Sequence, residues 1–165
     1  YYATENLRLY AEAEWAFWTA PDVYSKLPED RHAAAAGAQR IMKAIAEKTT
    51  RFKPGQEVAS GILAIDTAGH TPGHVGLVID GRIAVVGDIL HRADLQLADP
   101  ELSTRFDVDP ALARATRKAA LTRIASEDMV VCGGHMRLPG AEEDPQGAAF
   151  LRLGAKGKGW QARIG

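Results

Sequence analysis

Cysteine is nearly absent from this 165-residue sequence, and long apolar runs are missing altogether. The single Cys132 excludes an intramolecular disulfide. No apolar run approaches the roughly 18 residues of a membrane-spanning helix, so we expect no membrane partner. A net charge of -1 gives no electrostatic basis for binding nucleic acid. With a hydrophobic content of 46%, residues 1–165 have the length and composition of a single globular domain.

Two further signals are missing. The sequence has no Gly-x-Ser-x-Gly stretch, and its lone cysteine has no histidine at a plausible spacing, so a side-chain nucleophile is not indicated. The first residues, YYAT, have neither the basic start nor the apolar core of a signal peptide. We therefore expect a cytoplasmic location, or a periplasmic or secreted one if a signal precedes this sequence.

Hydrophobic periodicity and turn residues predict a mixture of strands and helices, hence the α/β or α+β class. Asp109-Pro110 is a helix start, because Asp caps the first turn and Pro favours the first helical position. Asp80-Gly81 is a two-residue turn between apolar runs. The predicted strands are residues 7–10, 57–65, 75–79, 83–86, 129–132, 150–153 and 160–164, and the predicted helices are residues 11–18, 29–48 and 110–126.

The helix predicted over residues 110–126 has an apolar and a basic face. We expect Leu112, Leu121 and Ile124 to point into the core. The basic side chains are expected to lie largely outward, and they are Arg114, Arg117, Lys118 and Arg123.

Three predicted strand ends carry a histidine or an aspartate. His70 and His74 lie in a loop rich in Gly and Pro between two apolar runs, Asp88 follows the next run, and His135 follows a later one. Side chains at the ends of rigid strands are well placed to hold a metal ion. A His/Asp set suits zinc or a similar first-row ion. The alternative is that the histidines bond to turn carbonyls and that Asp88 caps the following turn.

These residues lie in segments that resemble a known family. The segments AGHTPGH (68–74), GD (87–88) and GGHMRLPG (133–140) resemble motifs of the metallo-β-lactamase-fold hydrolases, in particular the branch of methyl parathion hydrolase and quorum-quenching lactonases. The resemblance includes AEWAFW (13–18) and LQLA (95–98), so it runs over nearly the whole chain. It implies an αββα sandwich, incomplete at the N-terminal side, with metals at one edge between two sheets.

The resemblance also implies roles for individual residues. His70 and His135 each match a metal ligand, and Asp88 matches the catalytic carboxylate that bridges two divalent ions, expected to be zinc. His74 matches no ligand, so we expect it to orient or pack against one. The implied reaction is hydrolysis of a small-molecule lactone, ester or phosphotriester by metal-generated hydroxide. A glyoxalase-II-like thioesterase or a sulfur dioxygenase is a weaker alternative within the same fold.

Substrate contacts are harder to predict. Trp15 and Trp18 could line an apolar pocket, although an aromatic cluster on a short helix is more often part of the core. Leu90 and His91 follow Asp88 directly, so we expect them at the mouth of the site, with His91 orienting substrate.

One family motif is missing. The signature His-x-His-x-Asp-His, which supplies half of a two-metal site, is absent. We therefore expect this chain to be the later portion of a longer protein that is active only with the missing motif. The competing hypothesis is a non-catalytic fragment or binding remnant of the fold. By analogy with related enzymes, a homodimer is the expected oligomer.

Overall fold

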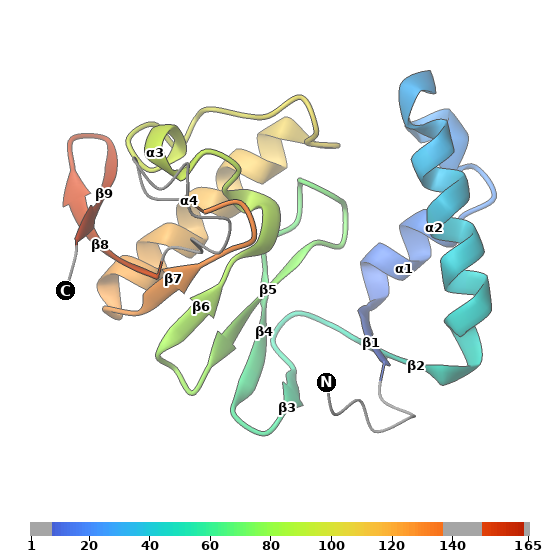
Figure 1. Ribbon diagram of the computed structural model, residues 1–165, viewed down its shortest axis with the longest axis horizontal. Helices are drawn as coiled ribbons and strands as arrows, with labels where there is room; N and C mark the ends of the chain where they lie inside the picture. The colour runs from blue at the N-terminus through green and yellow to red at the C-terminus, as the bar shows by residue number, and fades with distance from the viewer. Residues whose placement is uncertain (1–7, 137–149, 164–165) are drawn as a thin grey trace, which may run out of the picture.

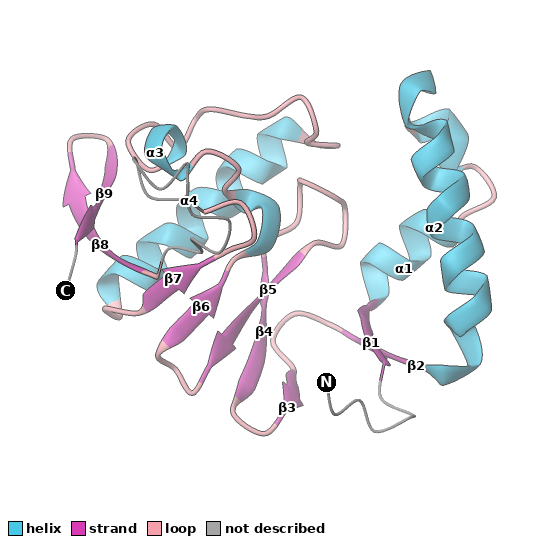
Figure 2. Ribbon diagram, in the orientation of Figure 1, coloured by secondary structure: helices cyan, strands magenta, loops and turns pink. Residues whose placement is uncertain are grey.

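Seven short strands form one sheet in which each strand lies beside its neighbour in the sequence, in the order β3-β4-β5-β6-β7-β8-β9. The computed structural model describes residues 8–136 and 150–163, and Figures 1 and 2 show the sheet at the centre of this part. Helices accompany the sheet, so the predicted mixed α/β class is confirmed. The sheet strands are β3 (Glu57–Ala59), β4 (Ile62–Asp66), β5 (Val75–Ile79), β6 (Ile83–Val85), β7 (Val130–Cys132), β8 (Leu151–Lys156) and β9 (Gly159–Arg163).

The sheet is antiparallel except at its centre, where β6 and β7 run parallel. Parallel neighbours need a long crossover, and here it contains a short 3-10 turn, η4 (Gly87–Ile89), and the helices α3 (Ala93–Gln96) and α4 (Pro110–Ser126). The carboxyl ends of β6 and β7 therefore open at the same edge of the sheet. The loop from β4 to β5 reaches this edge as well, because β5 is antiparallel to β6.

Helix α4 packs on one face of the sheet and closes the main core (Figure 1). Asp109 caps its first turn as expected, accepting a hydrogen bond from the Leu112 N–H at 3.0 Å. Leu121 and Ile124 are buried as predicted, but two other expectations for this helix are wrong. The Leu112 side chain is 41% exposed, while Arg117 is completely buried.

The opposite face of the sheet is also apolar. Side chains alternate between the two faces of a sheet, so every second residue of a strand points away from α4 and lines this second face. Leu77, Val85 and Cys132 lie in register across β5, β6 and β7, and all three are only half-buried. The described residues thus form a sheet with a core on one face and a row of partly open apolar side chains on the other.

The N-terminal elements form a smaller unit beside the sheet, to the right in Figure 1. Strand β1 (Arg8–Ala11) pairs in parallel with β2 (Thr49–Phe52), with α1 (Glu12–Thr19) and α2 (His32–Ile45) between them in sequence. The helix predicted over residues 29–48 is α-helical only in its middle. Short 3-10 turns precede and follow it, and they are η2 (Glu29–Arg31) and η3 (Ala46–Lys48), while η1 (Val23–Lys26) lies further upstream.

None of the helices within residues 8–136 and 150–163 is long and apolar enough to cross a membrane.

Candidate metal centre

Two glycines fix the loop that carries His70. Gly69 has a φ of +126°, and a Cβ there would lie 2.2 Å from the backbone nitrogen of Ala113 in α4. A Cβ at Gly73 would lie 1.8 Å from the backbone nitrogen of Glu14, whose carboxylate accepts the Gly73 N–H at 3.0 Å. The loop is therefore held between α4 and α1, and only glycine permits both close approaches.

His70 is oriented from behind by Asp107. The His70 Nδ1 lies 3.1 Å from Oδ1 of Asp107, a buried carboxylate on the segment before α4. Burial opposes the ionisation of Asp107, but its hydrogen bonds to His70 and to the Thr104 N–H, with the charge of Arg117, still lower its pKa. A carboxylate only accepts hydrogen bonds, so Nδ1 carries the proton and a neutral His70 keeps its Nε2 lone pair free.

Asp107 is absent from the site that the sequence predicts. It lies in the stretch of residues 89–108, which has no clear periodicity, and nothing in its local sequence distinguishes it from a surface aspartate. Backbone bonds bring this stretch to the histidine loop, since the Val108 N–H donates to His70 O at 3.0 Å and the Asp109 N–H donates to Gly69 O at 2.9 Å. The relation between Asp107 and His70 is thus a product of tertiary structure.

Asp88 lies between two histidines from different loops. Its Oδ2 is 3.5 Å from Nε2 of His70, and its Oδ1 is 3.3 Å from Nε2 of His135. The Val86 N–H donates to the Cys132 carbonyl at 2.9 Å, which keeps the ends of β6 and β7 together. The structure therefore brings together the three residues that the resemblance implies as metal ligands.

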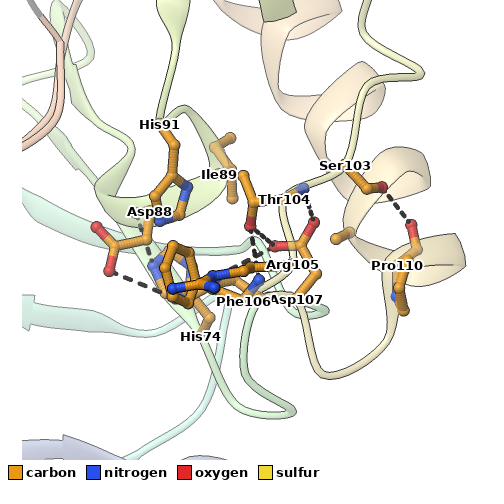
Figure 3. A network of polar contacts seen from close by, with 12 residues as sticks. His74, Asp88, Ile89, His91, Ser103, Thr104, Arg105, Phe106, Asp107 and Pro110 are labelled. Atoms are coloured by element: carbon orange, nitrogen blue, oxygen red, sulfur yellow. Dashed lines mark hydrogen bonds and ion pairs between the residues drawn. The ribbon is translucent and has the colours of Figure 1, made fainter.

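His91 joins the same cluster (Figure 3). Its ring centroid lies 4.6 Å from that of His135, nearly parallel, and 4.9 Å from that of His70. Burial lowers the pKa of His91, and the neighbouring His70 and His135 lower it further. Its Nδ1 is buried and has no hydrogen-bond partner among the described residues.

The donor set fits a divalent cation. His70, Asp88 and His91 each offer one ligand atom, and these atoms all lie within 4.8 Å of one another. Imidazole nitrogens with a carboxylate oxygen are suitable ligands for zinc and similar ions. The unpartnered Nδ1 of His91 is a further polar atom that a ligand could satisfy. The substrate-orienting role predicted for His91 stays a prediction, and its position beside His70 and Asp88 also makes it a fourth potential metal donor.

His74 lies behind Asp88. Its Nε2 accepts a hydrogen bond from the Asp88 backbone N–H at 3.1 Å, and its Nδ1 lies 2.7 Å from the Thr67 hydroxyl and 3.2 Å from the Thr67 carbonyl. Both ring nitrogens are thereby engaged with protein groups. Burial lowers the pKa of His74, and the nearby His70 contributes to the shift.

The two tryptophans have packing partners of their own. Trp15 is buried against the Tyr10 ring, with the Arg51 guanidinium over its face. The Trp18 indole N–H donates to the Glu14 carboxylate, the same group that accepts Gly73 N–H. Helix α1 is thus tied to the histidine loop through Glu14, and a pocket-lining role for either tryptophan stays a prediction.

The expected position of Leu90 requires correction. Its side chain is completely buried in the main core and does not open onto the mouth of the site. Gly87 turns the chain with a φ of +55°, and the following 3-10 turn directs Ile89 and Leu90 inward. His91 is the first residue after Asp88 whose side chain returns to the site.

Sequence comparison assigns the chain to a family. The family model of the metallo-β-lactamase superfamily matches residues 4–135. This match covers most of the chain, and the chain belongs to the metallo-β-lactamase superfamily. A search of the curated proteins found no match.

Solved structures support the same fold. The hydrolase AbOPH of the β-lactamase superfamily is 30% identical, with a TM-score of 0.73 over 93% of this chain. AidC, a dizinc quorum-quenching lactonase, is 21% identical with a TM-score of 0.77 over 94% of the chain. A probable metal-dependent hydrolase from Staphylococcus aureus is 17% identical with a TM-score of 0.62. The chain covers 53%, 53% and 51% of these proteins, about half their length.

Proposed function

We propose that this chain is the metal-binding later portion of a hydrolase that cleaves a lactone, ester or phosphotriester. The observation that carries the proposal is the position of the Asp88 carboxylate, whose oxygens lie 3.5 Å from Nε2 of His70 and 3.3 Å from Nε2 of His135 at the edge where β6 and β7 end. Family membership and the hydrolases among the similar structures support it.

In this proposal His70, Asp88 and His135 would supply part of the ligand set for two divalent ions, with zinc as the expected metal. When bound, such ions supply an activated water and polarise the oxygen of the attacked carbonyl or phosphoryl group. Asp107 keeps the Nε2 lone pair of His70 available, and the rigid turn after β6 presents the Asp88 carboxylate between the two histidines. His91 lies against both rings and orients the substrate.

The remaining metal ligands come from outside these 165 residues. Catalytic zinc normally has three protein ligands and an open position, so the predicted trio could hold one ion but not two. The similar solved proteins are about twice as long as this chain, which leaves room for the missing His-x-His-x-Asp-His motif. A homodimer of the full-length protein remains an expectation by analogy.

Metal analysis and kinetics of three single variants of the full-length protein test the proposal. We expect about two ions per chain and hydrolysis of a lactone or phosphotriester by the unmodified protein. His70→Ala and His135→Ala should both lose metal and activity. His91→Ala should keep its metal but lose activity, because His91 acts on the substrate.

The outcomes separate the alternatives. Equal metal loss in His91→Ala and His70→Ala would make His91 a ligand and refute its substrate role. A full-length protein that binds neither zinc nor manganese would refute the metallohydrolase proposal and favour the binding remnant. Thioester cleavage without lactone or phosphotriester cleavage would favour the glyoxalase-II-like alternative.

A further inference from the structure

Arg117 is a buried cation whose position calls for an explanation. Its side chain is 0% exposed in the middle of α4, although the polar pattern of the helix predicts an outward direction. Burying a charged group is costly unless it is paired and hydrogen-bonded. A leucine or methionine would fill this position in the core equally well. Packing alone therefore does not explain the arginine, and its polar contacts must be considered.

All of its polar partners belong to the crossover between Asp88 and α4. The Arg117 Nε donates to the Ile89 carbonyl at 2.6 Å, and Nη1 donates to the Pro100 and Leu102 carbonyls at 2.8 and 2.6 Å. Its Nη2 lies 3.8 Å from Oδ2 of Asp107 and makes no hydrogen bond within the described residues. The guanidinium therefore hydrogen-bonds three backbone carbonyls of the crossover.

These partners lie immediately behind the metal centre. Ile89 follows Asp88, and Asp107 is the carboxylate that orients His70. The carbonyl of Leu102 also accepts a hydrogen bond from the buried Gln96 amide, at 3.0 Å. The amide oxygen of Gln96 in turn accepts the His91 N–H at 2.7 Å.

One cation thus contacts the supports of three site residues, one beside Asp88, one behind His70 and one behind His91. Only a planar fork with several fixed donors can reach a carbonyl on either side and a carboxylate at the same time. A lysine ammonium at this position would keep the positive charge. It would not supply separate donors to the Ile89, Pro100 and Leu102 carbonyls while also facing the Asp107 carboxylate.

We propose that Arg117 is a positioning residue for the metal centre, which sets the orientation of His70 through Asp107 and the path of the crossover behind Asp88 and His91. The predicted effect of Arg117 on metal affinity rests on the proposed function. The structural effect of Arg117, the single Nδ1–H tautomer of His70, can be measured without any metal.

The test compares Arg117→Lys with Arg114→Lys in the full-length protein. Arg114 lies one turn earlier on α4, where it pairs with the exposed Glu101, so it is a matched control. Thermal unfolding reports folding, ring ¹⁵N shifts of His70 in the metal-free protein report its tautomer, and zinc titration reports affinity. We expect folded Arg117→Lys to lose the single Nδ1–H tautomer of His70 and to bind zinc about 10- to 100-fold more weakly. Arg114→Lys should match the unmodified protein.

A folded Arg117→Lys variant with an unchanged His70 tautomer and unchanged zinc affinity would overturn the proposal. If Arg117→Lys does not fold, Asp107→Asn provides the second test, because it removes the group through which Arg117 acts on His70. An unaltered His70 tautomer in that variant would also overturn the proposal. If the unmodified protein binds no zinc, the proposed function fails, while the metal-free tautomer measurement still decides the role of Arg117.

Discussion

The backbone N–H of Asp88 donates a hydrogen bond to Nε2 of His74 at 3.1 Å. Because Nε2 accepts, the ring proton must be on Nδ1, where the Thr67 carbonyl and hydroxyl lie close by. His74 is therefore held as the neutral imidazole and supports the turn that presents the Asp88 carboxylate. The two histidines of this loop therefore contact different parts of Asp88. His70 faces the Asp88 carboxylate, and His74 accepts a hydrogen bond from the Asp88 backbone.

This arrangement predicts a dependence of stability on pH. Burial lowers the pKa of His74, so below its ordinary value of about 6.5 the unfolded chain binds a proton that the folded chain does not. The contribution of His74 to the free energy of unfolding is thus complete above pH 6.5 and is lost progressively as the pH falls towards the lowered pKa. Urea unfolding of metal-free protein between pH 7.5 and 5 should show this loss, and His74→Gln should reduce it. His32→Gln, on α2, is the control, and an equal slope in all three proteins would contradict the prediction.

Gly87 should be intolerant of a side chain. A Cβ there would lie 2.6 Å from Nε2 of His74, and the φ of +55° is unfavourable for other residues. We expect Gly87→Ala to destabilise the protein by about 1–3 kcal/mol and to weaken metal binding. Gly157→Ala is a matched control, because Gly157 has a φ of +57° but a Cβ there would meet no atom within 4 Å. Equal metal affinity in the two variants would show that the contact with His74 has no influence on the site.

Replacement of the Asp88 carboxylate should impair metal retention and catalysis together. Asp88→Asn keeps the shape of the side chain but removes the charge that lies between His70 and His135. We expect both metal content and turnover of the full-length protein to fall, by more than the roughly 10- to 100-fold that is typical of losing an outer partner. Asp128→Asn, at the other end of β7, is the control. Near-normal metal content and turnover in Asp88→Asn would refute the bridging role.

The apolar row of Leu77, Val85 and Cys132 predicts a difference between this chain and the full-length protein. A sheet face lined by apolar side chains is normally packed against another layer of the fold, and the similar solved proteins have about twice the length of this chain. We expect the 165-residue chain to enhance the fluorescence of a hydrophobic dye and the full-length protein to do so far less. Equal dye binding by both would mean that this face stays open.

Sequence patterns were most informative where a local rule applies. The Asp109 cap, the Asp80-Gly81 turn and the strand ends near His70, Asp88 and His135 follow from turn chemistry and periodicity, and all were found as predicted. Asp107 and Arg117 could not be found in this way. Their roles depend on an irregular crossover folding back over α4, and a buried arginine has the same helical spacing as a solvated one. Leu90 was misplaced because the left-handed residue Gly87 and the 3-10 turn that it begins direct both Ile89 and Leu90 into the core.

The parallel pairing of β6 and β7 links the abundance of the protein in the cell to the supply of metal. Asp88 and His135 are separated in the sequence by the whole crossover, including α4, and only the pairing of β6 with β7 brings them together, so the unfolded chain has no comparable site. A cation that binds only the folded form stabilises it by mass action, by about 2.7 kcal/mol at a hundredfold excess over its dissociation constant. Metal starvation would then lower the abundance of the protein through proteolysis of unfolded chains, and not only the activity of each molecule.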